Sequence, residues 1–68
     1  MSYKGFKNYI NGIAHRTGAK VRSVVNDTEK QLFKAVFADG TTISVRPGEY
    51  NLTARWGDGH VATATANI

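Results

Sequence analysis

The spacing of apolar residues changes once along this chain, close to Gly18. Before that point residues such as Phe6 and Ile10 recur at the spacing of one helix face, whereas after it residues such as Phe33, Ala35 and Phe37 recur at every second position. Helices bury every third or fourth residue and strands every second one. We therefore predict an α+β fold, in which an N-terminal amphipathic helix packs on an antiparallel meander of four to five short strands.

The helix is predicted over residues 2–17. Ser2 is a favourable N-cap, and Gly18 stands where a left-handed residue would end the helix. However, Asn11-Gly12 is also a strong hairpin dipeptide, so an alternative remains in which residues 6–16 form a hairpin of an all-β, small barrel-like sheet. The apolar stripe of the predicted helix comprises Tyr3, Phe6, Ile10, Ile13 and Ala14.

Five strands are predicted, at about residues 20–26, 31–38, 41–46, 50–56 and 60–67. The loop between the second and third strands sets their register. A two-residue loop, Asp39-Gly40, would pair Phe37 with Thr42 and mix core with surface positions. A three-residue loop that adds Ala38 pairs apolar residues with one another throughout, and a one-residue slip would invert the faces. We therefore predict the three-residue loop, with Ala35 opposite Ile43 and Phe33 opposite Val45.

The last hairpin follows the same pattern, with a three-residue loop over residues 57–59. It is predicted to pair Leu52 with Ala64, Ala54 with Ala62 and Tyr50 with Ala66. Because large residues then stand beside small ones, space remains over the final two strands. We expect the apolar stripe of the helix to fill that space.

Size and composition narrow the class of protein. A chain of 68 residues forms one small domain, residues 1–68, without room for a deep substrate cleft. The absence of cysteine excludes disulfides and thiolate metal sites and points to the cytoplasm. No stretch is apolar enough for a signal peptide or a membrane span. Neither a metal nor another cofactor is expected, and no small-molecule substrate.

Basic residues are concentrated at the start of the chain. Five of the nine Lys and Arg residues precede residue 23, and the first acidic residue is Asp27. Clustered cations attract an anionic partner, and Asn side chains can recognise base edges. The sequence thus favours a small basic protein that contacts nucleic acid through its helix and first strand. The candidate residues are Lys4, Lys7, Asn8, Asn11, His15, Arg16, Lys20 and Arg22.

A second hypothesis is a protein-interaction module or small inhibitor, of the kind that accessory or phage genes encode. Leu32 and Val36 point away from the Phe33 face. Trp56, beside a turn, is expected to be either a lid on the core or an exposed anchor for a partner. The final strand is predicted to be a free edge that could add a strand from a partner or from a second copy of the chain. A homodimer is therefore one form of this hypothesis.

Catalysis is not indicated. His60 lies two residues from Asp58, but the chain has no nucleophile motif, no telling pair of carboxylates and no glycine-rich phosphate loop. The segment Gly57-Asp58-Gly59 is accounted for as a turn. We therefore expect a protein that is not an enzyme.

Overall fold

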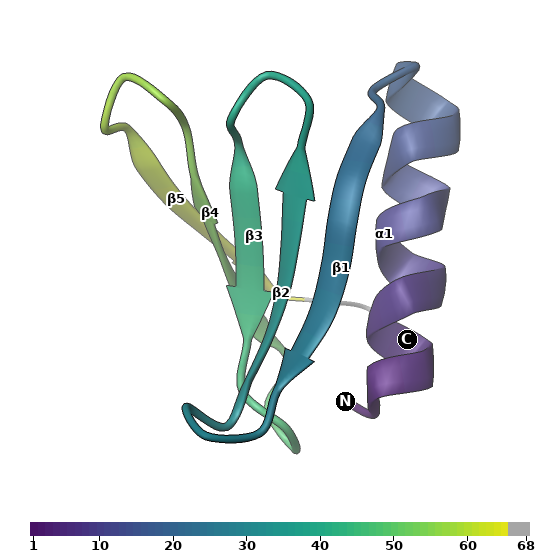
Figure 1. The fold of residues 1–68 in the computed structure, drawn as a ribbon, viewed down its shortest axis with the longest axis vertical. Coiled ribbons are helices and arrows are strands. Elements are labelled where there is room, and N and C mark those ends of the chain that lie inside the picture. Colours follow the sequence, from purple (N-terminus) through teal and green to yellow (C-terminus); the bar gives the residue numbers. More distant parts are fainter. Residues whose placement is uncertain (66–68) are drawn as a thin grey trace.

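The computed structural model describes residues 1–65 and has one helix on an open, five-stranded antiparallel sheet, which confirms the predicted fold class (Figure 1). The strands follow one another in the order β1-β2-β3-β4-β5, so β1 and β5 are the two edges. Residues 66 and 67, the end of the last predicted strand, lie outside the described residues. The elements are α1 (Tyr3–Thr17), β1 (Val21–Asp27), β2 (Leu32–Phe37), β3 (Thr42–Val45), β4 (Asn51–Arg55) and β5 (Val61–Thr65).

The two predicted caps define the ends of α1. The Ser2 hydroxyl accepts a hydrogen bond from the Gly5 backbone N–H at 3.0 Å. At the other end, Gly18 has a left-handed φ of 73° and donates its N–H to the Ala14 carbonyl oxygen at 2.9 Å. Asn11 and Gly12 lie inside the helix, so the hairpin alternative for residues 6–16 is wrong. Local turn propensity is overridden here because the helix buries a continuous apolar stripe.

The predicted registers of the two hairpins are confirmed within residues 1–65. Ala35 is opposite Ile43 and Phe33 is opposite Val45, across a three-residue loop in which Gly40 has a φ of 92°. In the last hairpin, Leu52 is opposite Ala64 and Ala54 is opposite Ala62. The predicted pairing of Tyr50 with Ala66 falls outside the described residues.

The hydrophobic core lies between α1 and the strands that it covers. Phe6 and Ile10 are fully buried, and the ring centroids of Phe6 and Phe33 are 5.8 Å apart. The start of the chain is held as well, because the Met1 amino group donates to the Glu49 carbonyl oxygen at 3.2 Å. The buried hydrophobic residues are Met1, Phe6, Ile10, Phe33, Ala35, Phe37, Val45 and Leu52.

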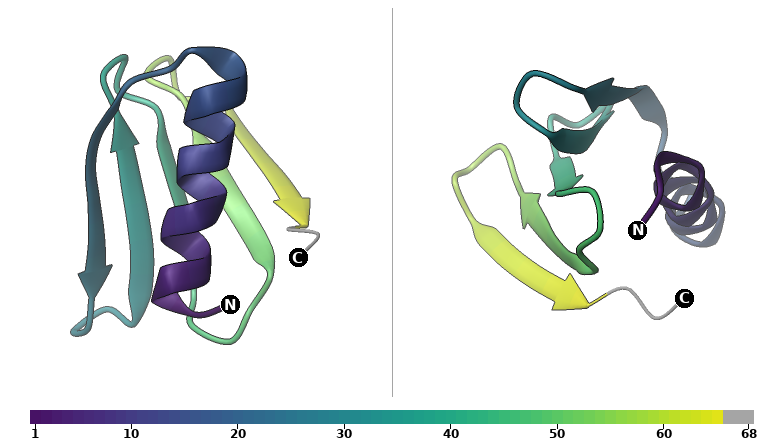
Figure 2. Two further views of the ribbon diagram at one scale, coloured as in Figure 1. Left: turned by 90° about the vertical axis from the view of Figure 1, so that its right-hand side faces the viewer. Right: turned by 90° about the horizontal axis from the view of Figure 1, so that it is seen from below.

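The position of α1 over the sheet differs from the prediction. The helix is in contact with β1 and β2 rather than with the final two strands. Figure 2 shows it on the inner side of the curved sheet. The connection to β1 is only residues 18–20, which holds the helix beside that strand, and the Tyr3 ring packs against Phe33 with 5.5 Å between centroids. Ala64 and Tyr50, expected to be inward, are exposed.

An apolar groove consequently separates α1 from β4 and β5. One part has a volume of about 170 Å³, and a neighbouring part beside Phe37 and Thr41 about 240 Å³. Tyr9 and Ile13 of the helix line one side of this groove, and the side formed by the sheet combines alanines with larger residues. Its lining includes Tyr9, Ile13, Leu52, Trp56, Ala62 and Ala64.

Candidate nucleic-acid interface

The face of α1 turned away from the sheet carries most of the predicted binding residues. Its polar side chains recur three or four residues apart, so they form one stripe along the helix. The helix has no acidic residue in its first turn, and its last turn carries two basic residues, His15 and Arg16. The exposed side chains of this face are Lys4, Lys7, Asn8, Asn11, His15 and Arg16.

Lys7 is held at the margin of this face that borders β1. Its Nζ atom lies 5.6 Å from the centroid of the Tyr3 ring, which is the distance of a cation–π contact. The Tyr3 hydroxyl in turn donates to the Val24 carbonyl oxygen at 3.0 Å. The Lys7 cation is thereby positioned near the junction of helix and sheet.

Arg16 lies back along the helix towards Gly12. A Cβ atom at Gly12 would come within 3.8 Å of the Arg16 Nη1 atom, so the guanidinium rests one turn before its own Cα. The side chain therefore adds its charge along one edge of the stripe that contains Asn8 and Asn11.

The last two predicted cations lie outside the helix. Lys20 is exposed in the connection that leads to β1, and its carbonyl oxygen accepts a hydrogen bond from the Ala38 N–H at 2.9 Å. Arg22 is exposed at an irregularity of β1, where the pairing with β2 shifts between Val21 and Ser23. Both continue the basic segment along the chain, but neither belongs to the stripe of α1.

The structure separates the three residues predicted to form a protein interface. Leu32 and Val36 are half-buried on the outer face of the sheet, because their neighbours Phe33 and Phe37 point into the core. Trp56 instead lines the groove on the inner side, with 39% of its surface exposed and its ring 5.1 Å from that of His60. No single partner surface includes all three.

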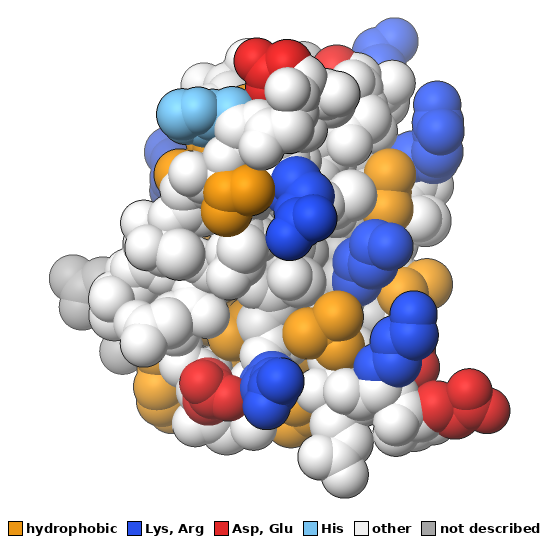
Figure 3. Space-filling view, turned by 90° about the vertical axis from the view of Figure 1, so that its left-hand side faces the viewer, with side chains coloured by type: hydrophobic (Ala, Val, Ile, Leu, Met, Phe, Trp, Pro, Cys, Tyr) orange, Lys and Arg blue, Asp and Glu red, His pale blue; other side chains and the backbone are white. Residues whose placement is uncertain are grey.

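The outer face of the sheet carries a second basic surface, whose residues are not among the candidates predicted from the sequence. Lys34 on β2 and Arg55 on β4 both point outward and flank a shallow hollow that Leu32, Thr42 and Ser44 also line. Figure 3 views the side opposite α1, and it shows Lys and Arg side chains interleaved with hydrophobic ones, with Asp and Glu near the upper and lower margins. The alternation within each strand does place Lys34 and Arg55 at outward positions. The distribution of charge along the chain, however, gives no indication that these two residues lie on one surface.

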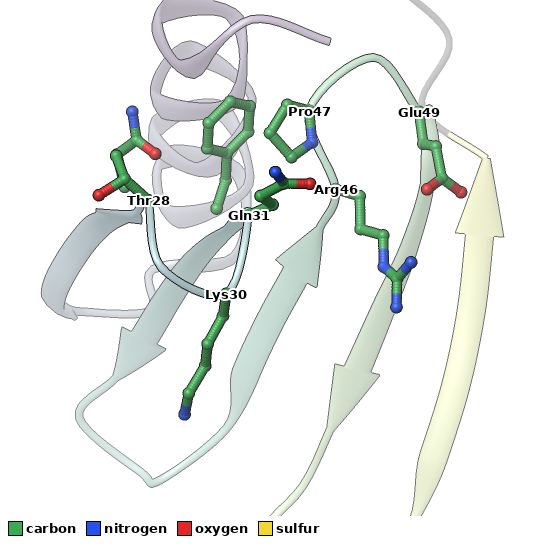
Figure 4. Close-up of a pocket in the computed structure, with 8 residues that line it drawn as sticks. Thr28, Lys30, Gln31, Arg46, Pro47 and Glu49 are labelled. Atoms are coloured by element: carbon green, nitrogen blue, oxygen red, sulfur yellow. The ribbon is translucent and has the colours of Figure 1, made fainter.

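A further hollow, of about 760 Å³, lies between two loops at the end of the sheet. In Figure 4 the side chains of Lys30, Arg46 and Glu49 extend away from Gln31 and Pro47. The charged groups therefore do not converge on a common point, and this hollow is not a constructed ligand site.

Within residues 1–65, no three His, Asp or Glu side chains gather closely enough to hold a metal ion. No helix in the described part of the chain is long and apolar enough to cross a membrane. Comparison of the chain with family models, curated proteins and solved structures finds no match.

Proposed function

We propose that this protein binds nucleic acid through the exposed face of α1 and acts without catalysis. The observation that carries the proposal is an exposed helix face that combines Lys4, Lys7 and Arg16 with Asn8 and Asn11. No acidic residue precedes Asp27, so the helix contributes no carboxylate that would repel a phosphate.

The dimensions of α1 suit a duplex. A helix of 15 residues is about 22 Å long at a rise of 1.5 Å per residue. The major groove of B-DNA is about 12 Å wide and accommodates a helix. In such a complex the Lys and Arg side chains would reach phosphates, while Asn8 and Asn11 would face base edges.

The His60–Asp58 pair supplies no argument for an enzyme. Asp58 Oδ1 accepts a hydrogen bond from the His60 backbone N–H at 2.9 Å, which is ordinary turn chemistry. That bond occupies the carboxylate with the backbone and leaves the imidazole against Trp56. We accordingly propose a binding protein, and we place its action in the cytoplasm because the chain contains no cysteine.

A pair of double variants tests the assignment of the helix. Lys4→Glu with Lys7→Glu reverses two charges on α1, and Lys34→Glu with Arg55→Glu reverses two on the outer face of the sheet. Both pairs change the net charge equally, so a comparison of their affinities for labelled duplex DNA and single-stranded RNA removes the general electrostatic effect. We expect the helix pair to weaken binding at least about tenfold more than the sheet pair.

A larger loss of affinity in the sheet pair than in the helix pair would contradict the proposal and assign the binding site to the outer face of the sheet. Equal losses would show a general attraction without a defined site. Circular dichroism of each variant establishes that the helix and sheet are retained.

A second candidate function is protein recognition by the outer face of the sheet. The observation in its favour is that Leu32 and Val36 are only half-buried there, beside Lys34. Aliphatic side chains with cations beside them are complementary to an acidic protein surface. Val36→Ser removes the aliphatic contact without changing the net charge, so it should weaken such a partner and leave nucleic-acid binding by α1 unchanged. Loss of nucleic-acid binding in a folded Val36→Ser variant would contradict the separation of the two surfaces.

A further inference from the structure

The two edges of the sheet are unequal, and the difference points to an interaction surface. Among residues 1–65, both β1 and β5 have one side without a neighbouring strand. Unpaired backbone groups on such an edge readily pair with another chain unless the edge is protected by a bulge, a charge, a proline or a covering element.

The β1 edge is protected in several ways. Its pairing with β2 is irregular between Val21 and Ser23, and the intervening residue is the charged Arg22. Helix α1 packs on this strand, and the Tyr3 hydroxyl occupies the carbonyl oxygen of Val24. The irregular pairing, the charge of Arg22 and the hydrogen bond at Val24 therefore all disfavour the addition of another strand at this edge.

The β5 edge has none of these protections over residues 61–65. The segment contains no charged residue and no proline, and its pairing with β4 is regular from Val61 to Thr65. On the outer face, 47% of the surface of Val61 is exposed. Alternation within an antiparallel ladder defines which backbone groups are unpaired.

The unpaired groups follow from the end of the last loop. The Trp56 N–H donates to the His60 carbonyl oxygen at 2.9 Å, so these residues form a hydrogen-bonded pair. Hydrogen-bonded and non-hydrogen-bonded pairs alternate along an antiparallel ladder, so the backbone groups of Ala62 and Ala64 bond to β4. The N–H and C=O groups of the residues between and beside them point away from β4. The outward-pointing residues are Val61, Thr63 and Thr65.

We infer that a second copy of this chain pairs with β5 in antiparallel fashion, with Thr63 opposite Thr63 of the other copy. This register uses every outward-pointing group of β5, since Val61 of each copy then bonds with Thr65 of the other. The strand is self-complementary because it is neutral and carries small or β-branched residues at every position. A closed two-fold dimer results, since the protected β1 edge does not continue the sheet.

The dimer can be measured without mutation. Sedimentation equilibrium across a concentration series should show the mass rising from 7.4 kDa towards twice that value. We expect dissociation in the micromolar range, because two short strands form a small interface. In amide hydrogen exchange, the N–H groups of Val61, Thr63 and Thr65 should become protected as concentration rises. Those of Ala62 and Ala64, already bonded to β4, should change little.

Charge substitutions at Thr63 test the register. Thr63→Lys alone and Thr63→Asp alone should each abolish the dimer, because like charges would stand directly opposite. An equimolar mixture of the two variants should restore it, and the matched control Thr63→Val should dimerise like the wild type. Recovery in the mixture also shows that both variants are folded.

Three results would overturn the proposal. They are a wild type that stays monomeric at millimolar concentration, Thr63→Lys and Thr63→Asp variants that each dimerise normally, or protection that appears at β1 instead of β5. The inference is independent of nucleic-acid binding, because the variant with Lys4→Glu and Lys7→Glu is expected to dimerise normally.

Discussion

The Tyr3 hydroxyl donates a hydrogen bond to the Val24 carbonyl oxygen at 3.0 Å, which joins the first turn of α1 to the outer side of β1. The same ring packs against Phe33, with 5.5 Å between centroids, and lies beneath the Lys7 ammonium. One side chain thus anchors the helix to the sheet and positions a cation of the proposed interface. The stability of the helix and the geometry of that interface are therefore coupled.

Removal of this hydrogen bond should destabilise the fold. We expect Tyr3→Phe to lower the free energy of unfolding by about 1 kcal/mol, because a partly buried carbonyl loses its partner while the ring is retained. Urea unfolding measures the change. Tyr9→Phe is the matched control, since the Tyr9 hydroxyl forms no hydrogen bond with residues 1–65 and its loss should change stability little. Equal effects of the two variants would contradict a specific role for the bond to Val24.

Asp39 should make stability depend on pH in the acid range. Its carboxylate accepts a hydrogen bond from the Thr41 backbone N–H at 2.9 Å. That bond, with a further contribution from the Thr41 side chain, lowers the pKa of Asp39 below its ordinary value of 3.8. Because the pKa is lowered in the folded state, the stabilisation is complete above the ordinary pKa and is lost as the pH falls through the lowered one.

Asp39→Asn separates the charge of this side chain from its shape. The amide can make the same turn without the charge, so the variant should be less stable than the wild type at neutral pH. The difference should shrink when the pH falls below the ordinary pKa of 3.8. Urea unfolding of both proteins across this range measures it, and a difference that stays constant with pH would show that the charge has no role.

Gln31 adopts a left-handed conformation that ordinarily suits glycine. Its φ is 51°, in the turn between β1 and β2. Such a conformation costs a residue with a Cβ atom about 1–2 kcal/mol. Gln31→Gly should therefore raise the free energy of unfolding by up to about 1 kcal/mol, after the greater entropy of glycine in the unfolded chain is deducted. Gln31→Val should lower it, because a β-branched residue tolerates this conformation least. Thermal unfolding of the three proteins gives the order, and a Gly variant less stable than the Val variant would contradict the account.

The hairpins could be predicted because local and non-local rules agree in them. A loop of three residues was the length that kept Ala35 opposite Ile43, and the structure has that register. The caps at Ser2 and Gly18 likewise depend on local backbone chemistry, and both are present. Where a single residue decides a turn or a helix end, sequence carries most of the information.

The placement of the helix could not be predicted in the same way. Small residues such as Ala62 and Ala64 indicated space over the final strands, but the short connection at residues 18–20 keeps α1 beside β1. The curvature of the sheet then leaves the groove unfilled. Similarly, Lys34 and Arg55 lie far apart in sequence and share a surface only because β3 aligns their strands. These features depend on how elements are arranged in space, which alternation does not encode.

The salt dependence of nucleic-acid affinity tests the central proposal most directly. Fluorescence anisotropy of labelled duplex DNA, titrated with the protein across a series of salt concentrations, gives the logarithm of affinity against the logarithm of salt. If the helix face contacts about three to five phosphates, the slope should be about −3 to −4.5, with micromolar or tighter binding at low salt. The absence of binding at low salt to both this duplex and single-stranded RNA would contradict the account and direct the search to a protein partner of the sheet.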